Sequence, residues 1–187
     1  MFAFNFLKKP KQTGAILPSS KKLALAITHG IALESATHIV ELGAGTGAFT
    51  QAIVQKKNKN AQFLAIEINE KMAQKLAKKI SNVDIEVNCA QNLKEILAQK
   101  DIQKVDCIIS GLPWTFFKDT QQDELLAMIY ECLNEGGYFV AFVYAFAFSP
   151  FRRRKFAKKL TKTFGNVEIP KIVWKNFPPA IIYRCKK

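Results

Sequence analysis

Three glycines and two carboxylates have the types and spacing of a site for a charged, nucleotide-like ligand. The stretch VELGAGTGAFT (40–50) places Gly43, Gly45 and Gly47 directly after an apolar segment. Glycine lets the backbone turn sharply and approach a ligand where a side chain would collide. A helix that begins there would offer free N–H groups at its first turn. The stretch therefore predicts a ligand-binding loop.

The two carboxylates lie on either side of this loop in the sequence. Glu41 precedes the first glycine by two residues and suits a ligand's ammonium group better than a pyrophosphate. Glu67 closes the next apolar segment, where a carboxylate can bind a ribose diol of either kind of cofactor. Residues 43–48 also satisfy the dinucleotide pattern G-x-G-x-x-A, so that alternative stays open from the loop alone. The length of chain after the loop leaves little room for the second domain that most nicotinamide enzymes use.

Alternating apolar segments place these residues on a predicted α/β sheet. Ser19 or Ser20, after Pro18, is the predicted N-cap of the first helix. The predicted helices cover residues 19–33, 47–57, 69–80, 91–98, 123–133 and 150–164. The predicted strands cover 37–42, 61–67, 84–88, 104–110 and 138–145, followed by a hairpin of 167–174 and 180–185. This alternation predicts a mostly parallel sheet with helices on both faces and an antiparallel C-terminal strand.

Composition and cysteine spacing exclude several other classes of protein. The 187 residues are 49% hydrophobic, which predicts one globular domain over residues 1–187. The four cysteines lack metal-ligand spacing, so we expect no bound metal. There is no uncharged apolar run long enough to span a bilayer and no signal-peptide pattern. We therefore expect a cytoplasmic protein.

Positive charge gathers at the two ends of the chain. Residues 1–30 hold 5 basic and no acidic residues, residues 31–145 hold 11 basic and 14 acidic, and residues 146–187 hold 12 basic and 1 acidic. This asymmetry predicts an anionic partner, either nucleic acid or a membrane surface. Residues 1–9 read as a short amphipathic helix with Phe2, Phe4, Phe6, Lys8 and Lys9, which suits a bilayer interface. Arg152, Arg153 and Arg154 in the helix at 150–164 could pair with lipid phosphate.

The segments VELGAGTGAF and IEIN resemble the S-adenosylmethionine site of class I methyltransferases, which have a seven-stranded Rossmann-like fold. The resemblance implies that Glu41 meets the amino end of the cofactor and that Glu67 and Ile68 lie at its ribose. It also assigns Gly43, Ala44, Gly45, Thr46 and Gly47 to the cofactor loop. Cys89 or Ala90 would lie near the adenine, at a place often held by aspartate in the family.

A narrower resemblance, to bacterial phospholipid N-methyltransferases, extends over nearly the whole chain. It rests on TGAILPSSKKLA, SGLPW and WKNFPPAIIYRC together with the two segments above. It places Ser19, Ser20 and Ser110 at the cofactor. It implies methyl transfer to the amine of phosphatidylethanolamine, towards phosphatidylcholine. We expect a monomer that associates peripherally with the inner face of the cell membrane.

The same family is related to ribosomal RNA adenine dimethylases, which often carry Asn-(Leu/Ile/Pro)-Pro-(Tyr/Phe) after the fourth strand. Ser110-Gly111 stands there in this chain, so an RNA adenine N6-methyltransferase is the less favoured alternative. A non-catalytic lipid-binding protein is a third alternative, disfavoured by the intact glycines and carboxylates. Trp114 and Tyr144 are the candidate aromatic walls of an amine pocket. The sequence singles out no general base.

Overall fold

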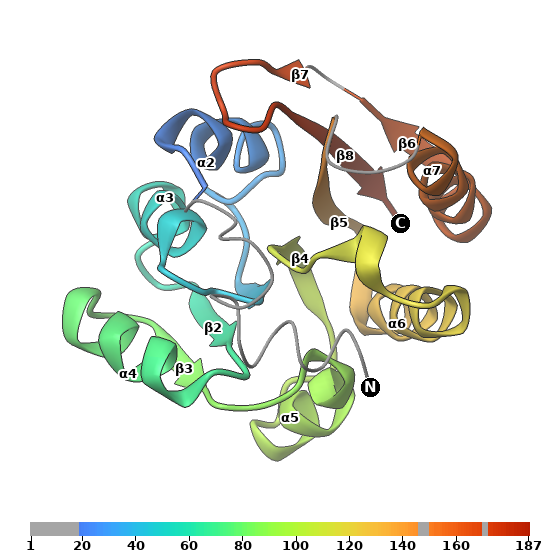
Figure 1. Cartoon of the computed structure of the whole chain (residues 1–187). Helices are drawn as coiled ribbons and strands as arrows, with labels where there is room; N and C mark the ends of the chain where they lie inside the picture. Colours follow the sequence, from blue (N-terminus) through green and yellow to red (C-terminus); the bar gives the residue numbers. More distant parts are fainter. Residues whose placement is uncertain (1–18, 146–149, 170–171) are drawn as a thin grey trace.

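A twisted sheet of eight strands forms the centre of the molecule (Figure 1). The computed structural model describes residues 19–145, 150–169 and 172–187. The strands are ordered β3-β2-β1-β4-β5-β8-β6, and β7 pairs with β8 off this path. Their bounds are β1 His38–Leu42, β2 Gln62–Ile66, β3 Asp84–Glu86, β4 Val105–Ser110, β5 Leu133–Tyr144, β6 Asn166–Glu168, β7 Ile172–Val173 and β8 Ala180–Lys186.

The directions of the strands confirm the predicted class I methyltransferase architecture. The strands β1 to β5 pair in parallel, whereas β8 runs antiparallel to β5, β6 and β7. The count of seven is wrong because the predicted strand 167–174 is divided into β6 and β7, which pair separately with β8. Pro170 falls between them in the sequence, and proline has no N–H to donate to a ladder.

Helices cover both faces of the sheet because alternate strand residues point to opposite sides. One core holds Ile39, Cys107 and Val140 with residues of α2 (Lys21–Ile27) and α3 (Ala48–Lys56). The other holds Val40, Ile108 and Phe139 with residues of α5, α6 and α7. The remaining helices are α4 Glu70–Lys79, α5 Leu93–Gln99, α6 Asp119–Cys132 and α7 Pro150–Phe164, with 3₁₀ turns η2 Ala90–Asn92 and η3 Trp114–Phe116.

Two predicted helices have the wrong bounds. The helix predicted over 19–33 ends at Ile27, since Gly30 and Ala32 adopt left-handed φ values of 68° and 54° that no helix continues through. The helix predicted over 123–133 begins earlier, at Asp119, where the Gln121 side chain accepts a hydrogen bond from the Lys118 N–H. The predicted helix over 1–9, with Phe2, Phe4, Phe6, Lys8 and Lys9, lies outside the described residues.

None of the helices in the described part of the chain is both long enough and apolar enough to cross a bilayer.

Candidate cofactor and methyl-transfer site

The candidate site lies where the parallel strands end, because the loops after β1, β2, β3 and β4 meet at that edge of the sheet. Backbone hydrogen bonds tie these loops together: the Gly43 N–H donates to the Ile66 carbonyl at 2.8 Å, and the Gly111 N–H donates to the Leu42 carbonyl at 2.8 Å. A Cβ atom at position 111 would lie 2.5 Å from the Gly43 carbonyl oxygen. Glycine at 111 therefore lets the fourth-strand loop pack directly on the glycine loop.

The glycine loop has the conformation that its sequence predicts. Gly43, Gly45 and Gly47 have φ values of 77°, 54° and 83°, which side-chain-bearing residues rarely adopt. Gly47 is the N-cap of α3, and a Cβ atom there would lie 2.4 Å from Leu76 Cδ1. Among the described residues, no heavy atom lies within 4 Å of the place of a Cβ atom at Gly45. The loop is thus packed at its ends and open at its centre, next to the start of a helix.

Glu41 is a buried carboxylate with one oxygen left unpaired. Its side chain is 0% exposed. The Thr50 hydroxyl donates to Oε2 at 2.6 Å, whereas Oε1 has no hydrogen-bond partner among the described residues. Burial, only partly offset by the Thr50 hydrogen bond, raises the pKa of Glu41 to about 8. A buried acceptor without a partner is costly to the fold, so this oxygen is suited to a cationic ligand.

Glu67 connects the glycine loop to the end of β2. Its carboxylate accepts hydrogen bonds at 2.8 Å from the N–H groups of Gly45 and Asn69. The Asn69 side chain in turn caps α4 by accepting from the Met72 N–H. Two backbone donors hold the carboxylate in place while it still lines a pocket, as a ribose-binding acid requires.

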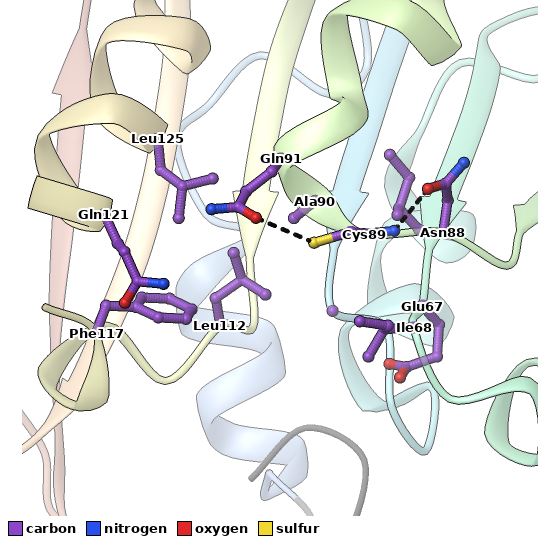
Figure 2. Close-up of a pocket in the computed structure, with 12 residues that line it drawn as sticks. Glu67, Ile68, Asn88, Cys89, Ala90, Gln91, Leu112, Phe117, Gln121 and Leu125 are labelled. Carbon is purple, nitrogen blue, oxygen red and sulfur yellow. Dashed lines mark hydrogen bonds between the residues drawn. The ribbon is translucent and has the colours of Figure 1, made fainter. Parts of the chain in front are cut away.

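Figure 2 shows that pocket, which lies between the loops after β2 and β3 and the start of α6. It brings together five of the predicted cofactor residues: Gly43, Glu67, Ile68, Cys89 and Ala90. Its other lining residues were not predicted: Ile66, Asn88, Gln91, Leu112, Phe117, Gln121 and Leu125. Ile68, Leu112, Phe117 and Leu125 supply apolar faces of the kind that a purine ring packs against.

No carboxylate lies at the predicted adenine position among the described residues of the pocket other than Glu67. The polar groups there are the side chains of Asn88 and Cys89. The Asn88 side chain accepts from the Cys89 N–H at 2.8 Å and from the Asn92 amide at 2.9 Å. The Cys89 thiol points along the pocket wall and donates to the side-chain amide oxygen of Gln91 at 3.6 Å (Figure 2). Cys89 therefore occupies the pocket with a small, weakly polar group.

The remaining predicted cofactor residues lie nearby but have other contacts. Ser19 and Thr46 line a second cavity, between α2 and α3. The Ser20 hydroxyl accepts from the Leu23 N–H and caps α2, which confirms it as the N-cap. Ala44 is 5% exposed and packs its side chain against Ala65 and Leu76, so only its backbone can meet a ligand.

The side chains of Trp114, predicted as a wall of the amine pocket, and of Ser110, predicted at the cofactor and in the catalytic loop, belong to the core, which corrects their assignment. Trp114 is 1% exposed, stacks on Phe156 at 5.1 Å between ring centroids, and is not a pocket wall. Its Nε1–H donates to the Ser110 hydroxyl at 3.0 Å. Ser110 is 0% exposed and also accepts from the Leu112 N–H, so its side chain is used to hold the fourth-strand loop. Sequence reasoning could not separate this pair from a site, because Ser110 ends β4 and Trp114 lies in the loop that follows it.

Tyr144 and the arginines lie at the same edge, outside the pocket of Figure 2. Tyr144 ends β5 half-buried, and burial raises its pKa to about 12. The Arg153 guanidinium donates to the Ala145 carbonyl at 2.8 Å, and that of Arg152 donates to the Thr115 carbonyl at 3.0 Å. Arg154 is exposed.

Thr50 is a functional candidate that the motifs did not predict. It lies on the first turn of α3, nine residues after Glu41, and is 0% exposed. A hydroxyl this close to a buried glutamate could have been anticipated only from the strand–loop–helix geometry, since the two residues share no local pattern.

The residues at this edge fit S-adenosylmethionine. The unpaired Glu41 oxygen suits its ammonium group, the open centre of the glycine loop admits close approach, and Glu67 is placed for its ribose. Cys89, Ala90 and Leu112 line the space left for its adenine. When bound, this cofactor supplies a methyl group on a positively charged sulfur.

Comparisons with known proteins agree with this geometry. The ornithine lipid N-methyltransferase of Singulisphaera acidiphila is 28% identical over 100% of this chain and 94% of its own length. The ribosomal RNA small subunit methyltransferase A of Thermotoga petrophila is 27% identical over 58% of this chain and 40% of its own length. The crystal structure of an S-adenosylmethionine-dependent O-methyltransferase from Thermotoga maritima superposes with a TM-score of 0.71 at 15% identity, covering 97% of this chain and 71% of its own.

A family model described as a methyltransferase domain matches residues 39–137, from β1 to the early part of β5. This span contains the glycine loop, both carboxylates, Cys89 and the fourth-strand loop. Because the match covers more than half of the chain, the chain belongs to this family, the class I methyltransferases that depend on S-adenosylmethionine.

Proposed function

We propose that this methyltransferase transfers methyl groups to the primary amine of a membrane lipid headgroup, with phosphatidylethanolamine, towards phosphatidylcholine, as the first substrate to test. An ornithine lipid presents the same kind of amine, and the similarity to the ornithine lipid enzyme extends over the whole chain. The proposal includes peripheral association with the inner face of the cell membrane.

The observation that most supports this proposal is where the cationic helix α7 begins. Its first turn is hydrogen-bonded to the loops that follow β4 and β5, through Arg152 to Thr115 and Arg153 to Ala145. A groove lies there, and its Lys155 is ion-paired with Asp119. Its lining residues are Thr115, Phe116, Phe117, Lys118, Asp119, Gln122, Phe151, Arg152 and Lys155. This groove shares Phe117 with the cofactor pocket. A lipid bound at α7, with an anionic phosphate and apolar chains, would therefore lie next to the methyl donor.

Methyl transfer requires mainly that the amine and the donor's methyl group are positioned next to each other and that the amine loses a proton. An alkylamine with a pKa near 10 costs roughly 4 kcal/mol to deprotonate at neutral pH. Neither histidine of the chain lies at the pocket: His38 starts β1 at the opposite edge, and His29 follows α2. Apolar side chains of the α7 groove, such as Phe116 and Phe151, would lower the amine pKa by desolvation. The chain would thus act by orientation and exclusion of water.

An RNA adenine N6-methyltransferase is the second candidate, because a ribosomal RNA methyltransferase matches about half of the chain and the flanks are basic. Two contacts weigh against it. Gly111 packs on the Gly43 carbonyl, where a side chain that binds an exocyclic amine would collide. The Ser110 hydroxyl is already bonded to Trp114 and Leu112.

One assay separates these candidates. The full chain is incubated with methyl-labelled donor and, in separate reactions, with phosphatidylglycerol vesicles containing phosphatidylethanolamine, the same vesicles containing an ornithine lipid, or ribosomal RNA. We expect label in extracted lipid, and the lipid that is labelled faster identifies the headgroup. Label in RNA alone would overturn the proposal in favour of the second candidate. Heat-denatured protein provides the blank.

A further inference from the structure

The turn between β7 and β8, residues 174–179, lies at the same edge of the sheet as the cofactor site. Ala180, which opens β8, pairs with Tyr144 at the end of β5. Because β5 runs parallel to β4 and β1, the end of β5 and the turn beside it belong to the edge where the glycine loop lies. In Figure 1 the turn passes next to α2, at the side of the sheet away from α4 and α5.

This turn exposes two aromatic side chains. Phe177 is 79% exposed and Trp174 is 62% exposed, and with Phe151 they are the most exposed large apolar residues in the described part of the chain. A single exposed apolar residue needs no explanation, but aromatic residues three positions apart in one turn form a small patch. Tryptophan in particular combines an apolar ring with a polar N–H and is favoured at membrane–water interfaces.

The turn is held rigidly from beneath, so its aromatic residues are presented in a fixed arrangement. Asn176, only 3% exposed, accepts from the Ser20 N–H at 3.0 Å and donates to the Pro178 carbonyl at 2.7 Å. The Ala145 N–H donates to the Pro179 carbonyl at 2.7 Å. These bonds connect the turn to the start of α2 and to the end of β5, so the exposed rings do not belong to a loosely attached loop.

Positive charge surrounds the aromatic patch. Lys175 lies between the two rings in the sequence and is exposed, as are Lys21 and Lys22 at the start of α2, beside the residue that Asn176 contacts. Aromatic rings within cationic surroundings are complementary to an anionic bilayer and not to another positively charged copy of this chain.

We propose that the 174–179 turn is a membrane-inserting element, with Trp174 and Phe177 in the headgroup region of an anionic bilayer and Lys21, Lys22 and Lys175 on its phosphates. This inference rests on the proposed function and deepens it, because it specifies which face meets the membrane. With the turn inserted, the edge of the sheet that holds the glycine loop faces the lipid surface, and the headgroup amine has the shortest path to the site.

The two tryptophans allow a direct test. Trp174 is exposed, whereas Trp114 is 1% exposed within the core and serves as an internal reference. The full chain is mixed with vesicles of equal parts phosphatidylglycerol and phosphatidylcholine that carry bromine on the acyl chains and contain no phosphatidylethanolamine. We expect a blue shift and quenching of Trp174 emission, both absent in Trp174→Phe, which still binds vesicles.

Sedimentation measures the energetic contribution of the turn. We expect Trp174→Glu combined with Phe177→Glu to weaken vesicle binding at least tenfold, while the Kd for S-adenosylhomocysteine stays within about twofold and reports an intact fold. Lys59→Glu is the matched control, because it changes the net charge by the same two units at the amino edge, just before β2. It should leave vesicle binding within about twofold, since that edge would face away from the membrane.

Two results would overturn the inference: vesicles that sediment the protein without quenching Trp174, or a double variant that binds vesicles as the wild type does. Either result would mean that another segment of the chain binds the membrane and that the turn does not insert. Failure of the proposed function gives a different result. In non-ionic detergent micelles containing phosphatidylethanolamine, the wild type would then transfer no methyl group, whatever the quenching in vesicles.

Discussion

The middle of the chain and its C-terminal flank differ in how they use charge. Between β1 and β5 the two carboxylates of the cofactor site are buried: Glu41 is 0% exposed and Glu67 is 6% exposed. Residues 146–187 hold 12 basic residues and 1 acidic residue, and in their described parts Arg154, Lys158 and Lys175 are exposed. A small cationic ligand can be recognised by a single buried carboxylate, because the low dielectric of the interior strengthens the ion pair between them. A broad anionic surface requires many solvated charges, each worth little.

This contrast predicts that the two regions can be impaired separately, and the largest effect should come from Glu41→Gln. The substitution keeps the shape and removes the negative charge from the only buried carboxylate with an unpaired oxygen in the described part of the chain. Loss of a buried charge pair costs about 3 kcal/mol or more, so the Kd for the donor should rise about a hundredfold. Isothermal titration with S-adenosylhomocysteine, which retains the ammonium group, measures it.

The same variant should become more stable without ligand, and vesicle binding should not change. The pKa of Glu41 is raised from 4.5 to about 8, so the folded state holds a proton that the unfolded state releases between those values. Stability therefore falls as pH rises from about 4.5 to 8, and the full cost is present above pH 8. Glutamine removes this cost. A Glu41→Gln protein that melts below the wild type at pH 8 would contradict this account.

The second effect is a pH dependence of donor binding in the wild type. An ionised Glu41 is required to pair with the donor's ammonium, and its pKa of about 8 means that the carboxyl must lose a proton before binding at neutral pH. The Kd should fall about tenfold per unit from pH 6 to 7, then flatten near pH 8. Titrations in buffers of different ionisation enthalpy should also show one proton released per donor bound at pH 7.

A pH-independent Kd between pH 6 and 8 would show that Glu41 is ionised before the donor arrives. Glu41→Gln is the control, because its weak binding should not vary with pH in that range.

The cofactor-binding residues of the glycine loop and Glu67 could be predicted from the sequence, because their function depends on local backbone geometry. Gly43, Gly45 and Gly47 have positive φ values and glycine is the residue that tolerates them, so the loop could be identified without any tertiary contact. Glu67 followed from its place at the end of a strand. By contrast, Thr50 and Leu125 reach the site only through the packing of α3 and α6 on the sheet, and Phe117 only through the turn η3 that precedes α6. No local pattern encodes this packing.

Trp114 shows the opposite failure. A tryptophan beside a Gly-Leu-Pro loop has the type expected of an amine pocket, yet α7 supplies Phe156 to stack on it. The predicted helix 150–164 was assigned correctly as a helix, but which of its residues face the core depends on where α7 crosses the sheet. Exposure of Trp174 was equally hidden, because it depends on Asn176 holding the turn against α2.

The third prediction concerns the contact between the glycine loop after β1 and the loop after β4. Gly111→Ala would place a Cβ atom against the Gly43 carbonyl oxygen, so the glycine loop must shift. A shift of this size in a binding loop should weaken donor binding about tenfold to thirtyfold and lower the melting temperature by several degrees. Gly165→Ala is the control: Gly165 has a positive φ, unlike Gly111, and no described atom lies within 4 Å of a Cβ there, so the change should cost stability without affecting the donor.

A smaller effect is expected in the cationic flank. Arg154→Gln removes one exposed charge from α7, and each basic residue near an anionic bilayer contributes about 1 kcal/mol. Affinity for phosphatidylglycerol vesicles should fall about fivefold at low salt, with the difference disappearing as salt is raised. Lys59→Gln at the amino edge should leave vesicle binding unchanged. Equal losses from both variants would show that net charge alone, and not the face that carries it, determines binding.

The smallest effect is a protection of Cys89 by ligand. The thiol of Cys89 lines the cofactor pocket and is partly exposed, whereas Cys107, Cys132 and Cys185 are buried. Burial raises the pKa of the Cys107 and Cys185 thiols to about 12, which removes the reactive thiolate at neutral pH. Iodoacetamide should therefore label Cys89 first, and saturating S-adenosylhomocysteine should slow that labelling several-fold. Labelling of Cys89 at the same rate with and without ligand, measured by peptide mass spectrometry, would mean that the adenine lies elsewhere and that the pocket of Figure 2 is not the cofactor site.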